Sequence, residues 1–165
     1  MNYNEIEKKW QSIWDKEESF KAVNGSSKEP YYILVEFPFH NKILNLEDIF
    51  DTIQSRGYRI IIAHPERYDF FQENYALVDD LRKNGFLFQS NYSSIIGGYG
   101  KESEKLIKYM LKKHYIDFLA TDIHRIDNTS VIDNFSKIEK KIIKETGESY
   151  YQRIKENSDK LTIHR

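Results

Sequence analysis

The chain has 165 residues, of which 39% are hydrophobic and 31% are charged, and its net charge is −1. This balance is typical of a soluble globular protein, and the lack of a basic excess argues against nucleic acid or an anionic membrane as a partner. The sequence contains no cysteine, which excludes disulfides, thiolate metal ligands and a cysteine nucleophile.

The predicted elements begin with an amphipathic helix over residues 3–17, where Trp10 and Trp14 share a face, followed by a linker up to residue 30. Charged residues occupy the positions where a signal peptide carries its apolar segment, and every apolar run is far shorter than the ~20 residues of a membrane span. We therefore expect a cytoplasmic protein without a membrane span.

From residue 31 onward, apolar runs alternate with segments of helical periodicity. Strands are predicted at 31–37, 59–64, 86–91 and 116–124, and helices at 46–56, 72–84, 101–114, 128–147 and 148–157. This alternation predicts an α/β fold with a largely parallel sheet.

Polar side chains stand at the C-terminal ends of all four predicted strands: Glu36, His64, Gln89 with Asn91, and Asp122 with His124. In α/β folds this edge of the sheet carries the chemistry. Asp122 and His124 are two residues apart on a strand, so their side chains are expected to face the same way. Mixed carboxylate and imidazole ligands suit Mn²⁺, Fe²⁺, Zn²⁺ or Mg²⁺, and a bound cation lowers the pKa of its water.

Each of these residues also has a structural interpretation. A histidine at a strand end is more often structural than functional, and Asp122 could simply cap a helix. Glu36 lies within "ILVEFPF", where we expect it to be buried, and a buried carboxylate without a partner is costly. Taken together, the four residues favour a metal site.

Arg67 lies three residues after His64, where its planar guanidinium could hold a phosphate group. Alternatively, it could pair with Glu66 or Asp69 at the surface. The glycine-rich segment "SIIGGYG" at 94–100 could cradle phosphate before a helix, although a plain loop is the simpler interpretation.

Four segments carry a family resemblance: "ILVEFPF", "IQSRGYRIIIAHPERY", "LRKNGFLFQSNYSSIIGGYG" and "IDFLATDIHR". In order and spacing they resemble the PHP-type (polymerase and histidinol phosphatase) protein-tyrosine phosphatases of bacterial capsule and exopolysaccharide loci. The resemblance implies a distorted (β/α) barrel that binds a cluster of divalent metal ions, with manganese expected first and iron, zinc or magnesium as alternatives.

The resemblance also implies roles for individual residues. Glu36, His64, Asp122 and His124 match metal ligands, and Arg67 matches an arginine that holds the substrate phosphate. The implied function is metal-dependent hydrolysis of protein phosphotyrosine, with a phosphotyrosine protein such as a bacterial tyrosine kinase tail as substrate.

The family's N-terminal strand bears Asp-x-His-x-His, and no His-x-His occurs in this sequence. The resemblance therefore covers only the C-terminal part of the PHP domain, residues 31–165, and leaves the ligand set incomplete. A non-catalytic fragment that binds metal or phosphate is the alternative. Unpaired strand edges in such a partial barrel predict self-association.

Residues 1 to about 35 are similar to the N-terminus of bacterial leucyl-tRNA synthetases. The synthetase motif His-x-Gly-His does not follow "YYILVEFPFHN", so no synthetase activity is expected.

Overall fold

The computed structural model describes residues 31–40, 46–123 and 130–162. The chain forms two compact units, one of residues 1–33 and 45–59 and the other of residues 34–44 and 60–165. The helix predicted at 3–17 and the metal ligand predicted at His124 lie outside the described residues. The proposed domain boundary near residue 30 therefore stays a prediction.

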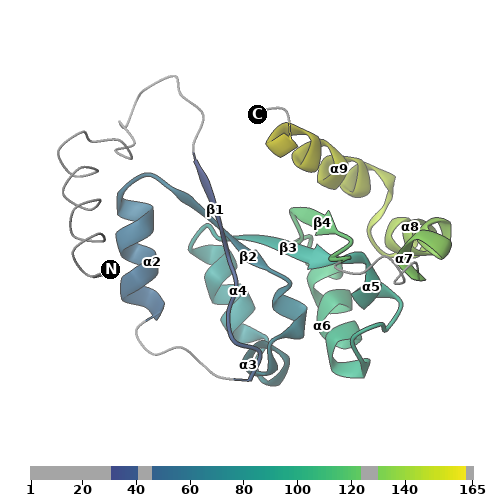
Figure 1. Cartoon of the computed structure of the whole chain (residues 1–165), viewed down its shortest axis with the longest axis horizontal. Coiled ribbons are helices and arrows are strands. Elements are labelled where there is room, and N and C mark those ends of the chain that lie inside the picture. Colours follow the sequence, from purple (N-terminus) through teal and green to yellow (C-terminus); the bar gives the residue numbers. More distant parts are fainter. Residues whose placement is uncertain (1–30, 41–45, 124–129, 163–165) are drawn as a thin grey trace, which may run out of the picture. The chain divides into compact units, whose positions relative to one another are not determined.

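Four strands form one sheet in the order β1 (Tyr32–Val35), β2 (Arg59–Ala63), β3 (Leu87–Asn91) and β4 (Phe118–Ala120) (Figure 1). β2 pairs in parallel with β3, and β3 pairs in parallel with β4. Each strand lies within its predicted range, but β4 ends at Ala120 and Asp122 has φ 53°, so the prediction that Asp122 lies on a strand is wrong. The predicted α/β fold with a parallel sheet is confirmed.

The helices follow the strands as expected: α2 (Leu46–Ser55), α3 (Asp69–Glu73), α4 (Ala76–Lys83), α5 (Tyr92–Ile95), α6 (Lys101–Lys112), α7 (Ser130–Asp133), α8 (Phe135–Thr146) and α9 (Glu148–Thr162). The prediction of one continuous helix over 72–84 is wrong. Asn74 is extended, and its Oδ1 accepts the N–H of Ala76 at 3.1 Å, which ends α3 and starts α4. The helix predicted over 128–147 is likewise divided at Asn134.

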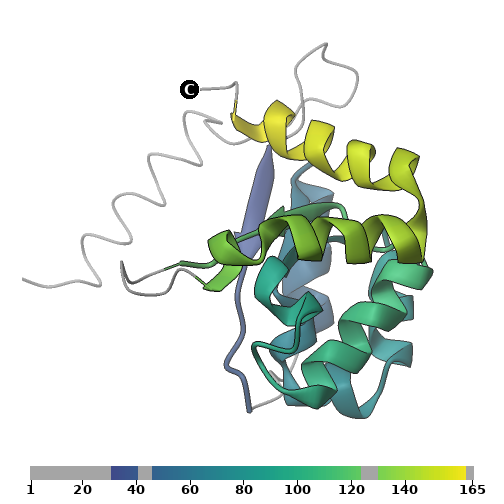
Figure 2. The ribbon, with the colours of Figure 1, turned by 90° about the vertical axis from the view of Figure 1, so that its right-hand side faces the viewer.

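The central strands and the helices that follow them supply the core. Ile60 and Ile62 of β2 and Phe88 of β3 are fully buried. α9 packs against β4 and α8, and Figure 2 shows α8 and α9 side by side. β4 is thereby held against α9.

β1 differs from the buried strand that its apolar sequence predicts. It lies at the edge of the sheet, and Leu34 is 58% exposed, whereas Phe37 just beyond the strand is buried. An apolar run looks the same at the edge of a sheet as at its centre, so only the strand order reveals the difference.

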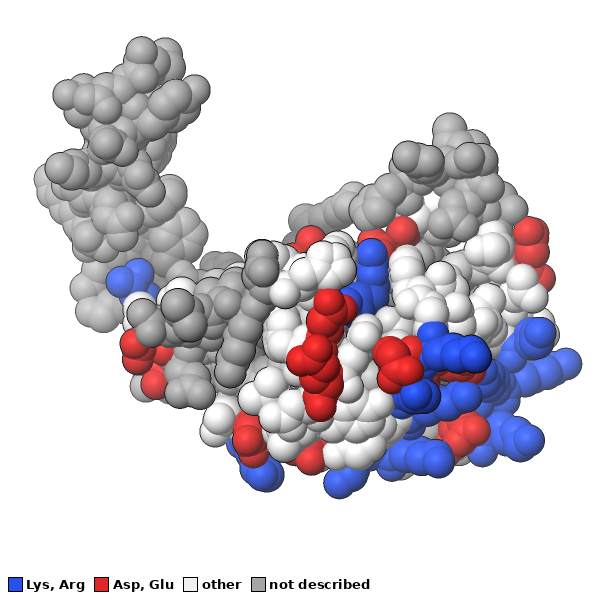
Figure 3. Space-filling view, turned by 90° about the horizontal axis from the view of Figure 1, so that it is seen from below, with Lys and Arg blue, Asp and Glu red and all other residues white. Residues whose placement is uncertain are grey.

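Charged side chains cover the outer helices. In Figure 3, lysine and arginine gather on the right-hand side of the face, the side on which α6 and α8 lie in Figure 1. On α6, Lys105 pairs with Glu102 at 2.7 Å and Lys108 with Glu104 at 2.9 Å, as expected of a solvated helix face. Within the part of the chain that the structure describes, no helix is long and apolar enough to cross a membrane.

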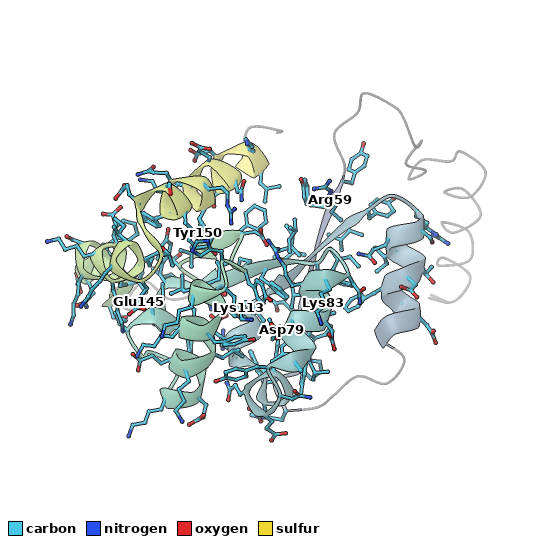
Figure 4. All side chains as sticks on the ribbon, turned by 180° about the vertical axis from the view of Figure 1, so that it is seen from behind. Arg59, Asp79, Lys83, Lys113, Glu145 and Tyr150 are labelled. Atoms are coloured by element: carbon cyan, nitrogen blue, oxygen red, sulfur yellow. The ribbon has the colours of Figure 1, made fainter. Side chains whose placement is uncertain are left out.

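A polar contact joins α4 to α6. Both oxygens of Asp79 accept from the hydroxyl of Tyr109, at 2.9 and 2.8 Å. Asp79, Lys83 and Lys113 lie close together in Figure 4. Burial acts to raise the pKa of Asp79, but hydrogen bonds from Tyr109 and Tyr115 outweigh it and hold that pKa below its ordinary value. The contact fixes the phenol of Tyr109 against a charged carboxylate.

Candidate functional site

The predicted site residues stand where strands end and the chain turns. His64 directly follows β2 and has φ 33° and ψ 56°, and Asp122, two residues after β4, has φ 53°. This left-handed conformation is uncommon for residues other than glycine and recurs at functional sites, although His and Asp tolerate it better than most. The N–H of His64 donates to the carbonyl of Gln89 at 2.6 Å, which ties this turn to β3.

His64 and Glu36 form the first pair of the site. His64 Nε2 lies 3.3 Å from Glu36 Oε1. The imidazole is only 6% exposed, whereas the Glu36 side chain is 66% exposed, so the expectation that Glu36 is buried is wrong. Glu36 follows the edge strand β1 and reaches the site from its solvent side. The other imidazole nitrogen, Nδ1, is buried and has no hydrogen-bond partner among the described residues.

Tyr68 holds the segment that carries Glu36. Its hydroxyl accepts the N–H of Phe37 at 3.0 Å, and the next residue, Asp69, donates its N–H to the carbonyl of Phe39 at 3.1 Å. Burial raises the pKa of Tyr68 to about 12, so the phenol stays neutral. This anchor places Glu36 beside His64, and sequence reasoning missed it.

Arg67 and Asp122 form the second pair. Arg67 Nη1 donates to Asp122 Oδ2 at 2.6 Å, and the two side chains are 22% and 15% exposed. The guanidinium carbon lies 4.5 Å from the ring centre of Phe39 and 4.2 Å from that of Tyr99. The alternative of a surface pair of Arg67 with Glu66 or Asp69 is therefore wrong, because Asp69 pairs with His40 and Glu66 is buried. The cationic group is instead held between two aromatic rings.

Asp122 Oδ2 gathers two further donors. Asn91 Nδ2 lies 2.9 Å from it and the hydroxyl of Tyr99 lies 3.3 Å away. Burial and then the charge of Asp122 raise the pKa of Tyr99, which keeps this phenol protonated. Asn91 stands at the expected strand end. Tyr99 had only one sequence signal, its position inside the glycine-rich segment.

The glycine-rich segment serves packing. A Cβ on Gly98 would lie 3.1 Å from the carbonyl oxygen of Ser93 and 2.1 Å from its Oγ, so glycine favours the close approach to α5 at this position. Gly98 also donates its N–H to the carbonyl of Ser93 at 2.9 Å. This supports the structural interpretation of the loop, which carries Tyr99 to Asp122 rather than forming a phosphate cradle of its own.

The structure thus brings the predicted residues together as two pairs, Glu36 with His64 and Arg67 with Asp122. The ring of Phe39 links them, because its centre lies 5.7 Å from that of His64 and it also contacts Arg67. Among the described residues, no group of three or more His, Cys, Asp or Glu side chains is arranged to hold a metal ion. Of the predicted ligands that the structure describes, only His64 and Glu36 lie side by side.

Residues 13–163 match the family model for capsular polysaccharide synthesis, CpsB/CapC. The chain belongs to the CpsB/CapC family. It is 35% identical to CapC of Staphylococcus aureus over 108 residues, which cover 66% of this chain and 42% of CapC. The family membership agrees with the predicted resemblance.

A solved structure matches this CpsB/CapC chain with a TM-score of 0.71 and 29% identity, over 79% of this chain and 52% of the other. It belongs to a study of YwqE from Bacillus subtilis and CpsB from Streptococcus pneumoniae, which are described there as metal-dependent tyrosine phosphatases. The chain spans about half the length of these phosphatase relatives.

Leucine–tRNA ligases are also similar to this chain. The ligase of Flavobacterium johnsoniae is 29% identical over 130 residues, which cover 71% of this chain and 13% of the ligase. The predicted similarity is confirmed, and it extends over more of the chain than the first 35 residues.

Proposed function

We propose that this chain supplies metal- and phosphate-binding residues of a CpsB/CapC-type phosphotyrosine phosphatase site. The observation that carries the proposal is the guanidinium of Arg67, which is held between Phe39 and Tyr99 and aligned by Asp122 at the C-terminal edge of the sheet. A planar, stacked guanidinium loses little freedom when it binds a phosphate group, so it is suited to hold the phosphoryl oxygens.

The described residues fit a divalent cation in part. Glu36 and His64 would be the first ligands, since a carboxylate and an imidazole lie side by side there. Asp122 and His124 would complete the set, in line with the family resemblance. Manganese is the expected ion, with iron, zinc and magnesium as alternatives, and when bound it would supply Lewis-acid activation of water and of the phosphoryl group.

The proposed substrate is a phosphotyrosine protein, such as the tail of a bacterial tyrosine kinase that regulates capsule or exopolysaccharide synthesis in the cytoplasm. The phosphatase description of YwqE and CpsB supports this choice. The second candidate is a non-catalytic fragment that binds metal or phosphate. The incomplete donor set among the described residues favours it for the chain in isolation.

Calorimetry that measures the binding of Mn²⁺ to the purified 165-residue chain tests the proposed metal site. We expect weak binding that His64→Ala abolishes, because a site with few ligands cannot repay dehydration of the ion. His114→Ala is the matched control, since the His114 ring stacks on Tyr150 at 4.2 Å and belongs to no predicted ligand set. Equal Mn²⁺ binding by His64→Ala and the unmodified chain would contradict the proposal.

Binding of a phosphotyrosine peptide and of its unphosphorylated form tests the phosphate part. We expect the chain to prefer the phosphorylated peptide and Arg67→Ala to lose this preference, whereas Arg56→Ala, which removes an exposed arginine, keeps it. Release of phosphate with Mn²⁺ and with a chelator separates the two candidates. Little turnover is expected from this chain alone, and robust chelator-sensitive turnover would exclude the non-catalytic candidate.

We further propose that the chain self-associates through the edge of β1, where Leu34 is exposed. Light scattering at increasing protein concentration tests this. A monomer at all concentrations would contradict it.

A further inference from the structure

Glu66 is an ionisable residue that is completely buried. Its Oε1 accepts the N–H of Asn91 at 2.9 Å and the hydroxyl of Ser94 at 2.7 Å. Its backbone carbonyl accepts the hydroxyl of Ser103 at 2.8 Å and Nε2 of Gln72 at 2.8 Å. A single residue is therefore bonded to β3 and to three helices.

This arrangement is costly if its only purpose is stability. Burial raises the pKa of the Glu66 carboxyl, and in the described part of the chain its buried Oε2 has only the Ser90 hydroxyl as a neighbouring donor. An apolar side chain would fill such a position without the desolvation cost. The bonds that Glu66 makes go to segments that carry site residues.

Those bonds form a closed series of contacts that includes Arg67 and Asp122, the second pair of the site. Glu66 Oε1 holds the backbone of Asn91, whose Nδ2 donates to Asp122 Oδ2 at 2.9 Å. Asp122 accepts from Arg67, which is joined to Glu66 by a peptide bond. Movement of the Arg67 backbone relative to Asp122 therefore strains the bond between Glu66 and Asn91.

We propose that Glu66 is a positioning residue, which holds the turn Pro65–Arg67 on the end of β3 and so fixes Arg67 against Asp122. It acts through Arg67 and touches no substrate. The importance of this role for phosphate binding rests on the proposed function, but the ordering of Arg67 itself can be measured without any ligand.

The experiment follows the side-chain N–H signals of Arg67 by NMR in the 165-residue chain, with Arg67→Lys to assign them. We expect slow rotation of the guanidinium in the unmodified chain, and rotation about tenfold faster in Glu66→Ala, which corresponds to a loss of about 1.4 kcal/mol. Glu66→Gln should restore slow rotation, because its amide oxygen can accept both bonds and its N–H₂ can donate to Ser90 Oγ.

Asp117→Asn is the matched control. Asp117 is also a buried carboxylate that accepts a backbone N–H of β3, that of Phe88 at 3.0 Å, but it precedes β4 and lies at the other end of the sheet. We expect this variant to lower stability and to leave Arg67 rotation unchanged. Equal effects of Asp117→Asn and Glu66→Ala on Arg67, or slow Arg67 rotation in folded Glu66→Ala, would overturn the proposal.

Ser94→Ala decides the question if Glu66→Ala does not fold, because it removes one bond to Oε1 and buries no new polar group. Faster Arg67 rotation in Ser94→Ala supports the positioning role, and unchanged rotation overturns it. Binding of the phosphotyrosine peptide distinguishes the positioning role of Glu66 from the proposed function. If the unmodified chain does not bind the peptide but Arg67 rotation still depends on Glu66, the proposed function fails and the positioning role stands.

Discussion

The hydroxyl group of Tyr150 makes two hydrogen bonds that phenylalanine cannot replace. It donates to the carbonyl of Ile116 at 2.8 Å and accepts the N–H of the same residue at 2.9 Å. Ile116 is fully buried just before β4, so water cannot take over either bond. In Tyr150→Phe both backbone groups of Ile116 lose this partner.

The expected cost follows from those two groups. Because each orphaned buried group costs roughly 1–3 kcal/mol, the free energy of unfolding should fall by about 2–6 kcal/mol. For a chain of this size each kcal/mol corresponds to about 2–4 °C, so the midpoint of thermal unfolding should fall by roughly 4–24 °C. Circular dichroism during thermal and urea unfolding measures both quantities.

Tyr151→Phe is the matched control, since it makes the same change at the next residue of α9. The Tyr151 hydroxyl is also buried, but its polar neighbours are the side chains of Tyr92 and Glu139, and no buried backbone group depends on it among the residues that the structure describes. Its removal should change the free energy of unfolding by no more than about 0.5 kcal/mol, or stabilise the fold slightly. Similar losses in the two variants would refute the reasoning.

Three other variants test individual contacts. Arg67→Lys keeps the charge but loses the planar fork, so affinity for a phosphotyrosine peptide should fall about tenfold in fluorescence polarisation, and unchanged affinity would contradict this. Asp117→Ala removes the acceptor of two Arg82 bonds, at 2.6 and 3.1 Å, and should cost about 3–5 kcal/mol in urea unfolding while sparing Mn²⁺ binding. Burial, and then Asp79, raise the pKa of Tyr109 to about 12, whereas an unfolded tyrosine titrates near 10. As the pH rises, Tyr109 therefore loses its proton in the unfolded state before it does so in the folded state, and its contribution to stability disappears between about pH 10 and 12. Over that range the free energy of unfolding, measured with urea, should decline less steeply for Tyr109→Phe than for the unmodified chain.

Local sequence patterns were enough to predict the α/β class, the positions of the strands and the edge of the sheet where polar residues collect. Those patterns are apolar runs of strand length, helical periodicity, and a polar residue where each strand ends. His64 and Asp122 can therefore be assigned to one edge from the sequence alone. The break between two helices at Asn74 cannot be predicted from the sequence, because a side-chain cap can divide a segment without changing the helical periodicity of its apolar residues.

Tertiary packing settles which residues meet. Glu36 is exposed because β1 lies at the edge of the sheet, and strand order is a non-local property that an apolar run does not encode. The partner of Arg67 is Asp122, 55 residues away along the chain, and not its sequence neighbour Glu66. A surface position for Glu66 is the natural expectation from sequence, since nothing around it signals burial, whereas the packing of β3, α3, α5 and α6 leaves it no solvent contact. Local sequence patterns determine the helices and strands and place polar residues where the strands end. Which of these residues are buried, and which pair with one another, is decided only when the elements pack together.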